Sequence, residues 1–132
     1  MLRKLLFPVA VIYTFALVVV TFINLNGVPS LGSSFDDKIY HFIAYAGLAG
    51  LWITYSKSTQ KEHKLWAVFV IVILFGVLLE VLQHQLNENR TYDTYDLLAN
   101  CFGVIIGTLI AARVDIIKLK QKEVLLFFLL FN

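Results

Sequence analysis

The sequence predicts an all-α membrane protein: a bundle of four transmembrane helices with both termini in the cytoplasm. Hydrophobic residues make up 59% of its 132 residues and charged residues 15%, against about 45–50% and 25% in an average soluble domain. The mean hydropathy is +0.78. A soluble core of this size could not bury so much apolar surface, whereas a bilayer can. The net charge of +2 comes from scattered lysines and not from a basic face, so no nucleic-acid partner is expected.

Four apolar stretches approach or exceed the length of about 20 residues that crosses a bilayer as a helix. We expect a single domain over residues 1–132, with spans at about 5–25, 39–55, 65–86 and 96–113 and a cytoplasmic tail at 114–132. Helices are expected because an unpaired backbone group in lipid costs several kcal/mol. The third stretch is the most apolar, since Ala67 to Leu79 contains no polar side chain.

The two ends of the chain need separate consideration. Arg3 and Lys4 give the first stretch a basic start, as in a signal peptide, but its apolar run is too long and no cleavage site of the A-x-A type follows. We therefore expect a retained anchor. The tail ends in eight apolar residues, 124–131, which are too few to span. The sequence leaves open whether they lie on the inner surface or extend a helix.

The distribution of lysine and arginine predicts the orientation. Their counts alternate between high and low along five segments: the N-terminus, residues 24–38, residues 56–64, residues 87–96, and the tail. The positive-inside rule then places both termini and the 56–64 loop in the cytoplasm. The other two loops would lie outside.

With this orientation, the residues able to do chemistry gather at the outer face. Three are candidates for acid, base or nucleophilic roles: Glu80, His41 and Asp96. Six are candidates for binding a substrate: Lys38, Arg90, Asp37, Gln83, Asp93 and Asn100. The fourth stretch also carries Gly103-x-x-x-Gly107-x-x-x-Ala111, a small-residue spacing for which we favour tight packing within the bundle over a dimer face.

Glu80 is the most informative of these residues. It lies about six residues, or roughly 9 Å, inside the third stretch. A carboxylate there costs about 2.5–3.5 kcal/mol on insertion scales and usually faces a partner or a wet cavity. Arg90 is its expected partner. The pair is either part of a functional pocket, which we favour, or a structural ion pair that fixes the helix register.

Other members of the set have structural explanations that stay open. Asp37 fits a capping box with Ser34, and Asp93 fits an N-cap with Asp96 in the first turn. His84 lies one turn from Glu80, a spacing that can hold a metal, but the sequence places no third ligand. No metal and no cofactor is therefore expected.

Taken together, four ordered motifs resemble the VanZ-like family of bacterial membrane proteins. They are Asp37-Lys38-x-x-His41-Phe42, Glu80-x-x-Gln83, Arg90-x-x-Asp93-x-x-Asp96 and Asn100-x-x-Gly103. The resemblance implies a multi-pass protein of the bacterial inner membrane, in a family associated with teicoplanin, or glycopeptide, resistance and without a settled biochemical activity. Thr91-Tyr92 stands where a small residue is expected, which bears on what the site admits.

Three classes of function are compatible with this pattern. The first is a membrane-embedded enzyme or binding site for a lipid-linked or cell-wall precursor; whether it is an enzyme is left open. The second is a non-catalytic envelope protein that supports a partner. The third is a small transporter, disfavoured because no charged residue lies in the inner half of the spans. Membrane lipids are expected partners, while the substrate and the oligomeric state are left open.

Overall fold

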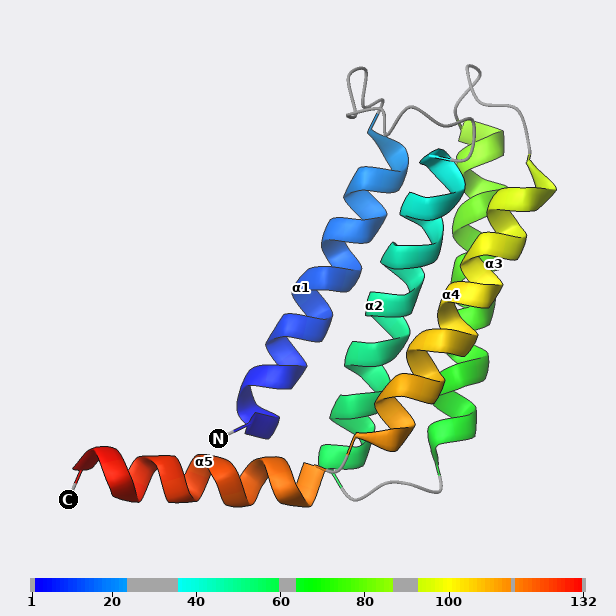
Figure 1. The fold of residues 1–132 in the computed structure, drawn as a ribbon. Helices are drawn as coiled ribbons and strands as arrows, with labels where there is room; N and C mark the ends of the chain where they lie inside the picture. Colours follow the sequence, from blue (N-terminus) through cyan, green and yellow to red (C-terminus); the bar gives the residue numbers. More distant parts are fainter. Residues whose placement is uncertain (1, 24–35, 60–63, 87–92, 115, 132) are drawn as a thin grey trace.

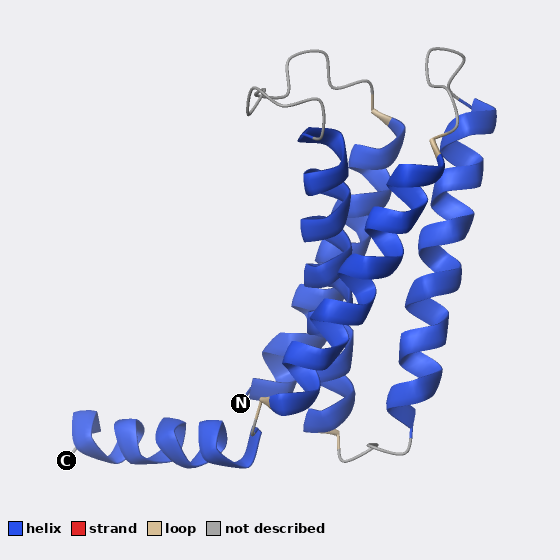
Figure 2. Cartoon of the chain, turned by 45° about the vertical axis from the view of Figure 1, so that its right-hand side comes forward, coloured by secondary structure: helices blue, strands red, loops and turns tan. Residues whose placement is uncertain are grey.

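The described residues of the chain form five helices. In this computed structural model the described residues are 2–23, 36–59, 64–86, 93–114 and 116–131. The helices are α1 (Leu2–Phe22), α2 (Asp36–Ser58), α3 (Leu65–Leu86), α4 (Thr94–Arg113) and α5 (Ile116–Phe131). All regular secondary structure within the described ranges is helical (Figure 2), so the all-α fold class is confirmed.

The first four helices run side by side, up and down, and α2 lies between the others (Figure 1). It contacts α1, α3 and α4 in the bundle and also touches α5. The termini of the chain lie at the same end of the bundle. The opposite end carries the first turns of α2 and α4 and the last turn of α3.

Three of the helices are long and apolar enough to cross a membrane, counting only the described residues: Arg3–Phe22 within α1, Leu65–Leu86 and Thr94–Arg113. Their outer faces expose large apolar side chains, such as Phe15, Ile71 and Leu109. Helix α2 is not in this set. It begins with Asp36, Asp37 and Lys38 and is the helix that the others surround, so fewer of its side chains need to suit lipid.

The closest approach in the bundle is between α2 and α4. A Cβ atom at Gly103 would overlap the backbone carbonyl of Phe42, and one at Gly107 would overlap that of Ala46. Glycine at these two positions therefore lets the two backbones touch. The preference for packing within the bundle over a dimer face is confirmed for this stripe.

Around that contact, Tyr45, Leu48, Ala49, Val72 and Val104 form a buried core drawn from α2, α3 and α4. Helix α1 joins it through two polar contacts as well as apolar packing. The Tyr13 hydroxyl donates to the carbonyl of Ala44 at 2.9 Å, and the Trp52 indole donates to the Thr14 hydroxyl at 3.0 Å. Both contacts give polar groups a hydrogen-bond partner, which lipid could not provide.

The tail forms helix α5, which runs across the bundle axis at the end that holds the N-terminus (Figure 1). Lys57 marks the junction. Its ammonium donates to the carbonyls of Ala111, Ala112 and Val114 at 3.1, 2.6 and 2.7 Å. A cation at this place stabilises the carbonyl groups that the end of α4 leaves without intrahelical partners. Residues 124–130 of α5 are exposed on every side.

The close contact between α2 and α4 predicts that Gly107 and Gly50 differ in how well they tolerate replacement by alanine. Gly107→Ala should lower the unfolding free energy by about 1–3 kcal/mol, because the added methyl meets backbone that cannot move aside. Gly50→Ala is the matched control on α2, since a Cβ there meets nothing within 4 Å. Thermal unfolding of the purified protein in detergent measures both, and equal melting temperatures would contradict the close contact.

Candidate functional site

The polar residues singled out in the sequence gather where α2, α3 and α4 meet, at the end of the bundle away from α5. We call this group the polar cluster, and it consists of Asp37, Lys38, His41, Glu80, Asp93, Asp96 and Asn100. Three of its members, Glu80, Asp96 and Asn100, are buried, with 6%, 5% and 2% exposure. Burial of this kind requires partners, since an unpaired polar group away from water costs free energy.

A chain of contacts runs from α2 through α4 to α3. His41 Nδ1 lies 2.9 Å from Asn100 Oδ1, and the Asn100 amide donates to Glu80 Oε2 at 3.5 Å. Glu80 Oε2 is also 4.0 Å from His41 Nδ1. Because the amide nitrogen faces the carboxylate, its oxygen is left to accept from the imidazole, so Nδ1 carries the proton.

Lys38 links the start of α2 to the start of α4. Its ammonium lies 2.6 Å from Asp93 and 3.2 Å from Asp96. Asp93 is the N-cap of α4 and also accepts from the backbone amide of Tyr95 at 2.8 Å. The hydrogen bond from Lys38, with that from Tyr95, lowers the pKa of Asp93. The same bond to Asp93, with the neighbouring Asp96 carboxylate, raises the pKa of Lys38.

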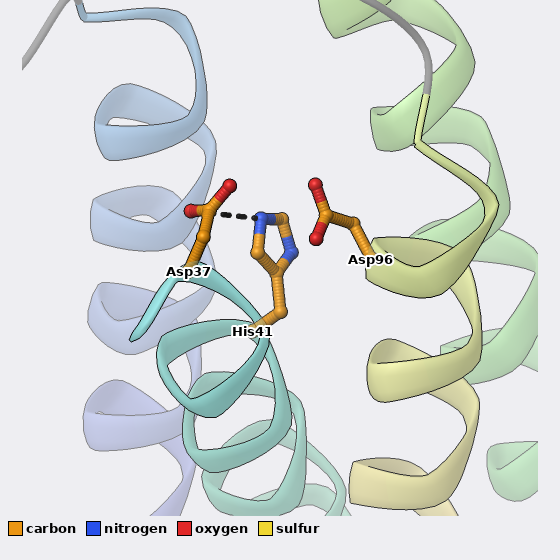
Figure 3. Close-up of side chains that lie close together, drawn as sticks. All are labelled: Asp37, His41 and Asp96. Carbon is orange, nitrogen blue, oxygen red and sulfur yellow. Dashed lines mark ion pairs between the residues drawn. The ribbon is translucent and has the colours of Figure 1, made fainter. Parts of the chain in front are cut away.

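Two carboxylates flank His41 (Figure 3). Asp37, one turn earlier on α2, places Oδ1 at 3.8 Å from His41 Nε2. Asp96 approaches the imidazole from α4 on the other side. One ligand atom from each of these three residues lies within 4.8 Å of the other two. Sequence spacing could not reveal this grouping, because Asp96 comes from a different helix.

Two candidate residues from the sequence, Gln83 and Arg90, are not among the members of the polar cluster. The Gln83 amide donates to the backbone carbonyl of Thr21 at 2.8 Å, so this side chain ties α3 to the last turn of α1. Arg90 lies outside the described residues, and with it the expected pair with Glu80. Among the described residues, Glu80 faces Asn100 and His41, and it points inward as expected.

A shallow, open apolar groove on the bundle surface reaches the cluster at Lys38. It runs between α2 and α4 and is lined by Lys38, Ile39, Phe42, Ala99, Phe102 and Ile106. The sequence analysis did not identify it. The signal was present in the spacing of the apolar residues, three or four apart on each helix, but this spacing also fits ordinary lipid-facing surface.

The cluster contains more negative groups than positive ones. Asp37, Glu80, Asp93 and Asp96 are carboxylic acids, while Lys38 is the one lysine or arginine that the described residues place among them. Lys38 is already shared by two aspartates. The arrangement therefore suits proton transfer by His41 or Glu80, or binding of a cation, better than direct capture of an anion by Lys38.

The shared pairing of Lys38 leads to a testable expectation. Lys38→Met should lower the unfolding free energy by about 1–3 kcal/mol, because it leaves the buried Asp96 carboxylate without its ion pair. Adding Asp96→Asn to that variant should restore part of the loss, since an uncharged amide needs no counter-charge. Melting temperatures of wild type, both single variants and the double variant form the cycle. Purely additive losses would contradict the pairing.

Comparison with known protein families gives a match. The family model described as VanZ/LLP1 matches residues 36–118, from the start of α2 into α5. That range contains every member of the polar cluster and leaves α1 outside. Curated proteins and solved structures gave no match. Because the matched range is more than half of the chain, and because its ordered motifs converge in space, the chain belongs to the VanZ/LLP1 family.

Proposed function

We propose that this VanZ-like protein binds or acts on lipid-linked or cell-envelope material at the outer face of the bacterial inner membrane. The observation that carries the proposal is the buried chain from His41 through Asn100 to Glu80. A carboxylate and an amide inside otherwise apolar helices are costly, and intramembrane ionisable residues mark functional sites by default. Their position at one end of the bundle supports a site that opens toward one face of the membrane.

The proposed topology has four spans and cytoplasmic termini. Its support is that α2 has 23 residues, about the length of its neighbours, and lies between three helices that have the length and apolarity of spans. The lysine and arginine counts favour the end that holds both termini as the cytoplasmic one. In this placement α5 lies along the inner surface, with the exposed apolar residues 124–130 against the lipid.

The apolar groove supports a lipid-linked substrate. It lies on the bundle surface between two helices of the proposed membrane region and begins at Lys38, a member of the polar cluster. An apolar chain lying against Ile39, Phe42 and Phe102 would bring its headgroup to the cluster. A soluble envelope component would gain nothing from such a surface.

A non-catalytic binding role is the alternative, favoured by the pairing of Lys38 with two aspartates, which is a stabilising arrangement. Turnover distinguishes the two. In an enzyme, Glu80→Gln would retain substrate binding but yield no product, whereas a binding protein would yield none in any form.

A functional cluster should separate activity from stability. Glu80→Gln and His41→Ala should each abolish any glycopeptide tolerance that the gene confers, with membrane abundance and melting nearly unchanged. Asp36→Asn and His84→Ala are matched controls, because they also neutralise an acid and remove an imidazole near the same end of the bundle, but outside the cluster. Tolerance is read as the minimal inhibitory concentration of teicoplanin. Variants that lose abundance in proportion to tolerance would make the cluster structural.

The topology is tested by labelling single cysteines in intact cells, starting from Cys101→Ala. A membrane-impermeant maleimide should label Glu88→Cys from outside and should not label Gln60→Cys until the cells are opened. The reverse pattern would overturn the orientation. Labelling of both positions in intact cells would mean that α3, which lies between them, does not cross the membrane.

A further inference from the structure

We propose that Asp37, His41 and Asp96 form a binding site for a divalent metal ion, of the kind that accepts mixed oxygen and nitrogen ligands, Mn²⁺ or Zn²⁺. Each residue offers one ligand atom, and these atoms lie within 4.8 Å of one another. The two carboxylates stand on either side of the imidazole (Figure 3). The sequence analysis expected no metal, because it paired Glu80 with His84 and could not bring Asp96 to α2.

The two ring nitrogens of His41 have different partners. His41 Nδ1 is committed to Asn100 Oδ1, at 2.9 Å, so Nε2 is the nitrogen that faces Asp37. In metal sites a ligating histidine usually donates its other ring N–H to a carbonyl or carboxylate, which fixes the tautomer. Asn100, held in turn by Glu80, provides this support.

The spacing of the ligand atoms on α2 also suits a bound ion. Nε2 of His41 and Oδ1 of Asp37 are 3.8 Å apart, beyond hydrogen-bonding range. Both atoms can reach a single ion between them, since Zn²⁺ binds imidazole nitrogen and carboxylate oxygen at about 2.0–2.2 Å.

Asp96 adds a ligand from α4, a different helix from the one that carries Asp37 and His41. Its side chain is 7% exposed, and it is aimed at His41 from α4. Oδ1 is buried and accepts no hydrogen bond from any group in the described part of the chain. Lys38 Nζ lies 3.2 Å from it and supplies charge. A metal ion would give this oxygen the directed bond that it lacks.

A bound metal ion would also indicate the class of substrate, and this part of the inference rests on the proposed function. Three protein ligands leave coordination positions open for a substrate. An anionic headgroup could bind there, although Lys38 is occupied by Asp93 and Asp96 and the other groups nearby are acidic. The substrate class would then be a phosphate- or carboxylate-bearing lipid, bound through the ion.

The site is tested with the full chain, purified in detergent and freed of metal with a chelator. Mn²⁺ is titrated alone, and the loss of its free electron paramagnetic resonance signal counts the ions bound. We expect one ion per chain, displaced by one equivalent of Zn²⁺. Asp37→Asn, His41→Ala and Asp96→Asn should each weaken binding at least tenfold, as ligand loss does. Asp36→Asn, with the same charge change one residue away, should stay within about twofold.

Two results would overturn the proposal. One is no Mn²⁺ or Zn²⁺ bound to folded wild type at millimolar concentration. The other is equal binding by wild type and all three ligand variants. Melting curves show which variants remain folded. The proposed function fails separately: intact metal binding in a protein that neither binds nor converts lipid-linked or cell-envelope material would remove that function and leave the ion site.

Discussion

The close contact between α2 and α4 is the constraint on which the rest of the molecule depends. Gly103 and Gly107 present bare backbone to Phe42 and Ala46, so the two helix axes come nearer than side chains elsewhere would allow. At that separation short side chains can bridge the two helices. Asn100 reaches His41, and Asp93 and Asp96 reach Lys38, because the helices are already in register below them. In lipid, such contact relies on van der Waals packing and polar pairing, since the hydrophobic effect adds little between two apolar helices.

The same geometry accounts for the uneven distribution of polarity. Helices α1, α3 and α4 present their apolar faces outward, and α2 occupies the space between them. Several of its polar groups find partners within the protein: the Ala44 carbonyl accepts from Tyr13, Trp52 donates to Thr14, and His41 contacts Asn100. A helix enclosed in this way can be the least apolar of the bundle and still satisfy its polar groups. The polar cluster extends this principle to ionisable residues at one end.

Sequence reasoning reached the fold through the features that a bilayer enforces. Long apolar runs predicted the helices, and the small-residue spacing predicted a packed interface, because these patterns are local. Glu80 could be singled out for the same reason: one charge in a run of apolar residues needs no knowledge of its neighbours. The partners could not be obtained this way. Asn100 as the bridge to His41, Gln83 as a tie to Thr21, and Asp96 beside Asp37 all depend on helix rotations that spacing within one helix does not determine.

The order in which the chain is synthesised gives the α2–α4 contact a further meaning. His41 precedes Asn100 by 59 residues and Lys38 precedes Asp93 by 55. When α2 leaves the ribosome, its ionisable side chains therefore have none of their α4 partners, which do not yet exist. The nascent protein must hold Lys38 and His41 near water until the fourth helix arrives and docks. Assembly of this end is consequently a late event, and a chain truncated before α4 would present a half-made polar surface to the lipid or to the quality-control proteases of the cell.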